Sequence, residues 1–198
     1  MEITNQVLNS IKSELQLIEV LKLYTNFKQS HWETISTFSF LSENFIKIHK
    51  DNVNWSIISQ FQKSENFIRE FKDKIDWTHI SQCQTLSENF IKEHKDYVDW
   101  SIISIYQTLS ENFIREYKDY VNWTYLSQFQ TFNWTYLSQF QTLSENFIRE
   151  FKDKFNWTYI STYQKLSESF IRDFKEKVNW KYISIHQKLS ENFIIGNW

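Results

Sequence analysis

The chain has almost none of the residues that usually form turns. Of its 198 residues one is Gly and none is Pro, and no Ala occurs anywhere. Ordinary globular chains hold about 7% Gly and about 5% Pro. The shortage argues against a β-sandwich, and against P-loop and dinucleotide-binding folds, because these folds depend on Gly at tight turns. It also argues against a collagen-like chain and proline-rich disorder.

Several other classes of protein are disfavoured as well. The single cysteine, Cys83, argues against a disulfide framework and a Cys-based zinc site. A net charge of −2 and a pI of about 6.2 provide no basic field for a phosphate backbone. No apolar run approaches the roughly 18 residues of a membrane span, and the polar N-terminus lacks the pattern of a signal peptide. We therefore expect a soluble intracellular protein without a membrane partner.

What the sequence does contain is a tandem repeat. Similar text returns after every 22 or 23 residues, with one interval of 11, and each copy opens on a Trp: Trp32, Trp55, Trp77, Trp100, Trp123, Trp134, Trp157 and Trp180. The second half of the repeat opens on a Ser-Glu pair: Ser42, Ser64, Ser87, Ser110, Ser144, Ser167 and Ser190. A fixed period of this size indicates an array or a solenoid.

The spacing inside each repeat is helical. Trp100 and Ile103 are three residues apart, and Leu109 and Phe113 are four apart, whereas the alternating core of a leucine-rich repeat is missing. Asn or Asp before Trp, and Ser before Glu, are residues that cap helices. The pattern predicts an all-α solenoid of two-helix repeats of about 23 residues. We name the helix that begins at Trp, about nine residues long, the A helix, and the one that begins at Glu, about ten residues long, the B helix.

A core follows from this pattern. We expect each repeat to bury its Trp, the Ile three residues later, the aromatic residue six later, and the Leu, Phe-Ile pair, second aromatic and final Val or Ile of the second half. A Ser four residues after Trp and a Gln seven after recur as well. Their repetition is open to a functional interpretation, but we favour a packing role, with Gln satisfying the ends of the short helices. The Glu of the second half precedes a basic residue by four positions, which supports a helix.

The repeat is broken at both ends and near its middle. Residues 1–30 lack it, and Leu8, Ile11, Leu15, Ile18 and Leu21 predict one amphipathic capping helix before a single repeat domain over 31–198. The last B half is cut short at 194–198, so its face is expected to be weakly covered. The second repeat lacks its Leu beside Lys63, which predicts a shorter A–B connection.

At 122–143 the A half occurs twice with no B half between the copies. Either one continuous helix spans both copies, or the chain reverses at 132–134, which we slightly favour. In both cases we expect the phase of A and B helices to slip, and the solenoid to kink or change pitch.

No motif points to catalysis, a metal or a cofactor. His49, His94 and His186, like Cys83, replace aromatic residues of the repeat, and His79 stands where other repeats have Tyr or Ile. The carboxylates are copied from repeat to repeat among Lys residues, as on a solvated helix face, whereas a catalytic site is normally unique. We therefore expect no enzyme, no metal site and no cofactor.

Two binding functions remain. The B helices mix charges of both signs and offer no basic stripe, so nucleic-acid binding by the helical repeats is the alternative and not the leading hypothesis. The A helices offer a neutral polar face, which favours a scaffold or interaction module with an unidentified protein partner. The candidate partner surface on the A helices consists of Tyr125, Tyr136, Tyr159 and Tyr182.

The repeat W-x-x-I-S-x-x-Q-x-L-S-E-x-F-I, over about residues 32–195, resembles short tandem-repeat proteins of giant DNA viruses and phages. The resemblance implies an expanded A/T-rich viral repeat family without an assigned function, so no functional residue can be carried over. If the source is viral, the cytoplasm of the host cell is the expected location. The duplicated half repeat departs from the pattern.

Overall fold

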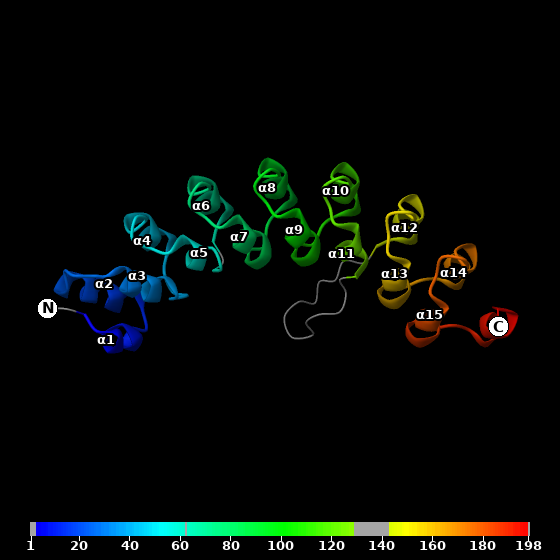
Figure 1. Cartoon of the computed structure of the whole chain (residues 1–198), viewed down its shortest axis with the longest axis horizontal. Helices are drawn as coiled ribbons and strands as arrows, with labels where there is room; N and C mark the ends of the chain where they lie inside the picture. The colour runs from blue at the N-terminus through cyan, green and yellow to red at the C-terminus, as the bar shows by residue number, and fades with distance from the viewer. Residues whose placement is uncertain (1–2, 62, 129–142, 198) are drawn as a thin grey trace. The chain divides into compact units, whose positions relative to one another are not determined.

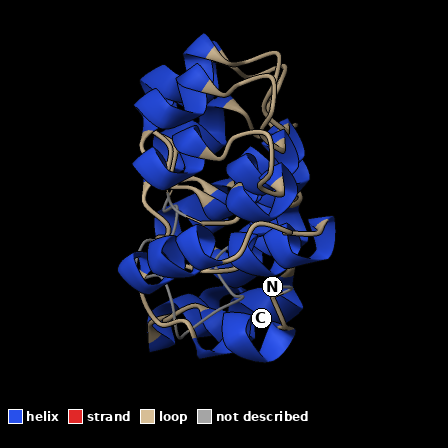
Figure 2. Ribbon diagram, turned by 90° about the vertical axis from the view of Figure 1, so that its left-hand side faces the viewer, coloured by secondary structure: helices blue, strands red, loops and turns tan. Residues whose placement is uncertain are grey.

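The chain is all-helical. The computed structural model describes residues 3–61, 63–128 and 143–197, and this part contains helices and connections but no β-strand (Figure 2). The prediction of an all-α solenoid of two-helix repeats is confirmed. The chain divides into two compact units, residues 1–99 and 100–198, so the boundary lies between two repeats.

The A helices form one layer within each compact unit, and the B helices form the other (Figure 1). The A helices are α3 (Gln29–Ser36), α5 (Trp55–Ile58), α7 (Trp77–Cys83), α9 (Trp100–Tyr106), α11 (Trp123–Gln128), α13 (Trp157–Tyr163) and α15 (Trp180–His186). The B helices are α4 (Glu43–Ile48), α6 (Glu65–Glu70), α8 (Glu88–Glu93), α10 (Glu111–Glu116), α12 (Glu145–Glu150), α14 (Glu168–Asp173) and α16 (Glu191–Asn197).

Both kinds of helix are shorter than the sequence pattern predicted. A typical A helix has seven residues and a typical B helix six. The B helix α8 ends because His94 leaves the helical conformation, with φ −113° and ψ 29°. The backbone N–H groups of Tyr97 and Val98 then donate to the His94 carbonyl, which returns the chain and places Val98 in the core. The last apolar residue of the repeat is therefore buried by a turn and not by a third turn of helix.

The predicted core is largely confirmed. The residue three positions after Trp is buried in every described repeat, as is the Phe of every B helix: Ile35, Ile58, Ile80, Ile103, Leu126, Ile160 and Ile183, with Phe45, Phe67, Phe90, Phe113, Phe147, Phe170 and Phe193. The expectation for the aromatic residue six positions after Trp is wrong, since Tyr106 is 47% exposed and His186 is exposed. Positions three, four and seven after Trp share one helix face, and position six lies off that face.

The Trp side chains are mostly half-buried, because each indole lies between the layers with its polar edge outward. Trp77 stacks on Phe90 with ring centroids 6.2 Å apart. Its Nε1 donates to the carbonyl of Lys72 at 3.0 Å, so the polar atom is satisfied without reaching the core.

The N-terminal segment forms two helices, where one capping helix was expected. The helix α1 (Asn5–Ser10) is capped by Thr4 and packs on α3, and α2 (Glu14–Leu23) is capped by Ser13. Ser13-Glu14 is an additional copy of the Ser-Glu pair, and Leu17 is fully buried at the place of the B-helix Ile. This segment is therefore a degenerate repeat, with α1 in the A position and α2 in the B position.

The recurrent Ser of the A helix joins consecutive A helices. The Ser59 hydroxyl donates to the carbonyl of Trp55 at 2.7 Å and accepts the backbone N–H of Asp76 at 2.9 Å. Asp76 is the N-cap of the next A helix. The same pair of bonds occurs at Ser36, Ser104, Ser127 and Ser161. The packing role expected for this Ser is confirmed.

The recurrent Gln joins each repeat to the A–B connection of the preceding one. Gln84 is 2% exposed; its Nε2 donates to the carbonyls of Ser59 and Phe61, at 2.9 and 2.6 Å. Its Oε1 accepts the N–H of Lys63 at 2.8 Å. Because the connection between two short helices leaves carbonyls and N–H groups free, one amide that bonds on both sides satisfies several of them. This confirms the packing role.

The missing Leu of the second repeat is replaced by Lys63. Its backbone N–H bonds the Gln of the next repeat, as that of Leu143 does in a complete connection. Its Nζ reaches the carbonyl of Leu41 at 3.2 Å. Burial lowers the pKa of Lys63, partly offset by the carboxylates of Glu43 and Glu14.

The phase slip expected at 122–143 does not occur in the contacts on either side of that segment. The A helix α11 pairs with the B helix α12, since Trp123 lies 6.3 Å from Phe147 between ring centroids. The N–H of Asn156 donates to Ser127 Oγ at 3.1 Å, as the next A-helix N-cap does in other repeats. Eleven additional residues are therefore accommodated between α11 and α12 without a change of register. Whether the duplicated text forms one helix or reverses at 132–134 concerns residues outside the described ones.

Candidate partner surface

The predicted tyrosines lie on consecutive A helices of the second compact unit. Tyr125 is on α11, Tyr159 on α13 and Tyr182 on α15, and all three side chains are half-buried. The helices α11 and α13 pack on each other, as do α13 and α15. The three side chains therefore occupy equivalent positions along one packed row of helices. Tyr136 lies outside the described residues.

The same row contains aromatic residues that the sequence pattern assigned to the core. Tyr163 lies 6.1 Å from Tyr159 between ring centroids, with the ring planes 22° apart. His186 is related in the same way to Tyr182, at 6.2 Å and 19°. Each pair is four residues apart on its helix, a spacing that places both rings on one face. This i, i+4 relation was visible in the sequence and could have moved Tyr163 and His186 from the core to the surface.

The tyrosine hydroxyl groups of this row are the next feature of the surface. Among the described residues, no hydrogen bond reaches the hydroxyl groups of Tyr159, Tyr163 or Tyr182; Tyr163 and Tyr159 contact each other only through their rings. No charged residue other than Lys181 lies within α13 or α15, apart from His186, whose charge depends on pH. The surface is therefore aromatic, nearly neutral and able to donate hydrogen bonds.

The hydrogen bonds by which the recurrent Ser joins consecutive A helices, here called serine bridges, hold this row in place. Ser127 and Ser161 each lie on the buried side of an A helix and bond the N-cap of the next one, Asn156 and Asn179. Since a buried hydroxyl with both a donor and an acceptor partner has one orientation, the spacing of the A helices is closely defined. The tyrosines on these A helices are therefore held at the same spacing.

The B layer is charged, and its charges are joined across repeats. The carboxylate of Glu145 accepts the N–H and the hydroxyl of Ser167, the N-cap of the next B helix. Equivalent Glu-to-Ser bonds run from Glu14 to Ser42, from Glu43 to Ser64, from Glu111 to Ser144 and from Glu168 to Ser190. The backbone N–H of Ser190 lowers the pKa of Glu168, since it bonds the charged form. The recurrent Glu thus links repeats, in addition to the predicted support of its own helix.

The Arg residues of the B helices also contact the next repeat along the chain. Arg69 Nε donates to Glu93 of the next repeat at 2.8 Å, and the guanidinium lies 4.9 Å above the ring of Phe90. The predicted pair within the helix, Arg69 with Glu65, is also present, at 3.6 Å. Arg115 repeats all of these contacts with Glu150, Phe147 and Glu111. These cations therefore face carboxylates and aromatic rings of the next repeat.

One polar cluster was missed by the sequence analysis. Asp76, Ser56 and His79 meet at the start of α7: His79 Nδ1 lies 3.0 Å from an Asp76 oxygen and 3.4 Å from Ser56 Oγ. The Asp76 pKa is lowered, although burial opposes the shift, because its carboxylate accepts the backbone N–H and the imidazole of His79. One imidazole nitrogen faces both partners, so this arrangement lacks the relay through two nitrogens that nucleophilic catalysis by Ser and His uses.

Two other histidines, His94 and His49 in the second aromatic position of the B half, pack against a Phe as the sequence pattern predicted, whereas His186 is exposed. His94 is 5% exposed and stacks on Phe90 with ring centroids 4.3 Å apart. His49 lies 4.5 Å from Phe45, and burial lowers its pKa. In the part of the chain that the structure describes, no three His, Cys, Asp or Glu side chains are grouped to hold a metal ion. No helix of the described ranges has both the length and the apolar character needed to cross a membrane.

Comparison of the chain with protein-family models, with curated proteins and with solved structures gives no match.

Proposed function

We propose that the chain is a non-catalytic helical-repeat scaffold that binds a protein partner through the A layer of its second compact unit. The observation that carries this proposal is the row of half-buried rings on α11, α13 and α15. Tyr159 and Tyr163 on α13, and Tyr182 on α15, together present ring faces and hydroxyls that have no hydrogen-bond partner among the described residues. Such rings bury large areas at a low cost in side-chain entropy, which is why protein interfaces are enriched in them.

The chemistry of the row indicates the partner. An apolar segment would cover the ring faces, and its backbone carbonyls would accept the phenolic hydroxyls. The A helices of the row carry few charges, and the B layer joins its cations to carboxylates of the next repeat. We therefore infer a protein segment and not a nucleic acid.

The test compares a triple variant with a double variant that serves as its control. Tyr159→Ser, Tyr163→Ser and Tyr182→Ser together remove the tyrosines of α13 and α15 from the row. The control, Tyr97→Ser with Tyr120→Ser, removes rings from elsewhere that are 47% and 45% exposed. Far-UV circular dichroism and urea unfolding first establish that each variant retains the helical fold.

Tagged wild-type chain and both variants are then used to capture partners from cells, with quantitative mass spectrometry of the recovered proteins. We expect the triple variant to lose a partner at least about tenfold, a change of about 1.4 kcal/mol in binding, while the control retains it. Equal recovery by all three would refute the A-layer assignment. If nuclease treatment removes the bound material and its binding falls steeply with salt, the partner is a nucleic acid and the proposal fails.

A further inference from the structure

At α15 and α16, the Ser and the Glu that join successive repeats elsewhere have no next repeat to bond among the described residues. The Ser184 hydroxyl is exposed and donates to the carbonyl of Lys181 at 2.9 Å, whereas the equivalent Ser161 donates to Trp157 and accepts the next N-cap. Glu191 is exposed and accepts no N-cap N–H among the described residues, in contrast to Glu168. The α15–α16 face thus offers two acceptors that internal junctions use.

The same face exposes apolar side chains. Ile185 is 62% exposed and Ile195 is 78% exposed. Ile195 stands five residues after the N-cap Ser190, the place that Arg172 occupies in the preceding repeat. Arg69, Arg115 and Arg149 form ion pairs with the next B helix, and Arg172 lies over the ring of Phe193. An Ile at this position replaces a cationic contact with an apolar one.

The α1–α2 end carries the matching donors. Thr4 and Ser13 are the N-caps of α1 and α2, and their backbone N–H groups have no acceptor in the described part of the chain. At internal junctions these are the groups that bond the Ser and the Glu of the preceding repeat.

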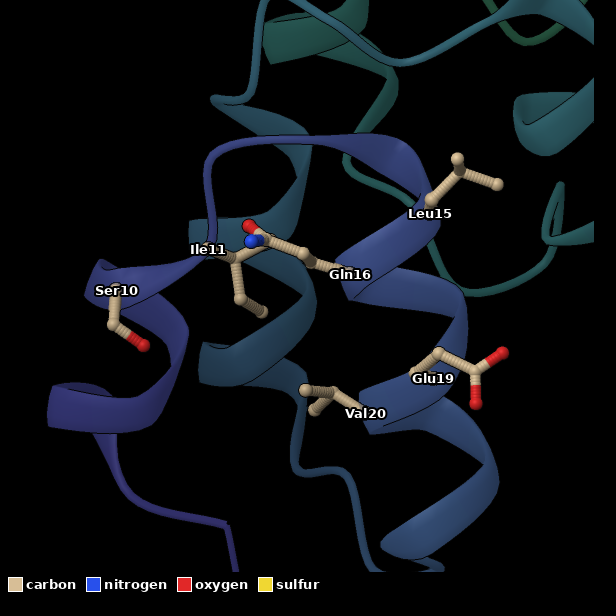
Figure 3. Close-up of a pocket in the computed structure, with 6 residues that line it drawn as sticks. All are labelled: Ser10, Ile11, Leu15, Gln16, Glu19 and Val20. Atoms are coloured by element: carbon tan, nitrogen blue, oxygen red, sulfur yellow. The ribbon is translucent and has the colours of Figure 1, made fainter.

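A pocket lies between these two N-terminal helices. It has a volume of about 420 Å³ and is lined by Ser10, Ile11, Leu15, Gln16, Glu19 and Val20. Gln16 and Val20 lie on the side of α2 that faces α1, and Ile11 lies in the connection between the helices (Figure 3). Leu15 is 77% exposed at its rim, at a position where the B helices of other repeats have Asn or Ser. The pocket thus has a largely apolar lining.

The register of the repeat places Ile195 at this pocket. Arg69, five residues after its N-cap, contacts Phe90 and Glu93, which are three and six residues after the next N-cap. The residues three and six after Ser13 are Gln16 and Glu19, and both line the pocket. A B helix that preceded α2 in the common register would therefore direct its fifth residue into the pocket.

We propose that the α15–α16 end of one copy docks on the α1–α2 end of a second copy. In this contact Ile195 enters the pocket, Ser184 accepts the N–H of Thr4, and Glu191 accepts the N–H of Ser13. The contact continues the junction that joins repeats inside the chain. Because the two docking faces differ, every assembly leaves one face of each kind uncovered. Further copies can therefore add, and the association is open-ended.

Sedimentation velocity and light scattering of the 198-residue chain test this contact over a concentration series up to about 1 mM, which covers weak protein contacts. We expect the mean mass to rise with concentration through dimers to longer species. Ile195→Glu and Leu15→Glu are each expected to keep the protein monomeric, since each places a carboxylate in or beside the pocket near Glu19. Ile48→Glu is the matched control, because Ile48 is 74% exposed on α4 and belongs neither to the lining of the pocket nor to α15 or α16. This variant should associate as the wild type does.

Mixing the two defective variants tests the direction of docking. Ile195→Glu retains an intact α1–α2 end and Leu15→Glu an intact α15–α16 end, so an equimolar mixture should form dimers and nothing larger. A wild-type chain that stays monomeric throughout the series overturns the proposal. So does a mixture that stays monomeric, or an Ile48→Glu variant that loses association as the end variants do. Far-UV circular dichroism establishes that all variants are folded.

Discussion

The repeat formed by α7 and α8 and the repeat formed by α11 and α12 differ in length by eleven residues, yet share most of their contacts. Trp77 lies 6.2 Å from Phe90, and Trp123 lies 6.3 Å from Phe147. The register of these repeats therefore depends on which side chains meet and not on the number of residues between them.

Uninterrupted repeats and the interrupted one differ in the glutamine that bonds the A–B connection. Gln84 makes three hydrogen bonds to the uninterrupted repeat of α5 and α6, and Gln187 makes three to that of α13 and α14. Gln164 is 1% exposed and its Oε1 accepts the N–H of Leu143, but its Nε2 has no hydrogen-bond partner among the described residues. The helices α11 and α12 thus keep the common register, while Gln164 makes fewer hydrogen bonds to described residues than Gln84 does. Four sets of variants test this comparison.

The largest effect is expected at the buried Phe of the two B helices. Phe90→Ala and Phe147→Ala each remove a fully buried ring, and each should lower the free energy of unfolding by about 3–5 kcal/mol. Equal losses in urea unfolding would show that the two repeats are packed equally well. A much smaller loss at Phe147 would mean that the interrupted repeat is loosely packed.

The glutamines should separate the two repeats. Gln84→Met leaves two carbonyls and one N–H without their partner, and should cost about 3 kcal/mol. Gln164→Met leaves only the N–H of Leu143, and should cost about 1 kcal/mol. Urea unfolding of both variants measures the difference; equal costs would show that the amide of Gln164 is as well bonded as that of Gln84.

The hydrogen bonds of the recurrent Ser should contribute equally in an uninterrupted repeat, that of α5 and α6 with Ser59, and in the interrupted one, with Ser127. Ser59→Ala and Ser127→Ala each leave a next-helix N–H without its acceptor, at a cost of about 1–2 kcal/mol. Ser184→Ala is the control, because Ser184 is exposed and bonds only its own helix, and should change stability by less than about 0.5 kcal/mol. A loss at Ser184 as large as at Ser59 would contradict the bridging role.

The smallest effect is expected from removing the duplication. Deletion of residues 132–142 restores the common repeat text after Thr131. Because the contacts on both sides already have the common register, and a longer connection costs little in chain entropy, stability should rise by less than about 1 kcal/mol. Thermal unfolding followed by circular dichroism measures this change. A loss of several kcal/mol would show that the duplicated residues make contacts essential to the fold.

Much of the fold was predictable from residues that recur. The caps Ser87 and Asp76 and the buried Phe90 and Ile80 were each predictable from spacing of three and four residues, because helix geometry is local. Position six after Trp was misassigned, since apolar character alone does not say which face a ring occupies. The sequence pattern placed Tyr125, Tyr159 and Tyr182 on the candidate partner surface, and it assigned Tyr163 and His186 to the core.

The sequence by itself determined the helical repeat, the capping residues and the apolar core, because caps and amphipathic spacing act within a few residues of chain. Only the tertiary structure decided the partners of the polar residues. That Ser59 bonds Asp76, that Arg69 faces Glu93 and that α11 pairs with α12 across the duplication depend on which repeats stack together. Stacking brings together groups that lie 17 or more residues apart in the chain, and local spacing contains no information about such distances.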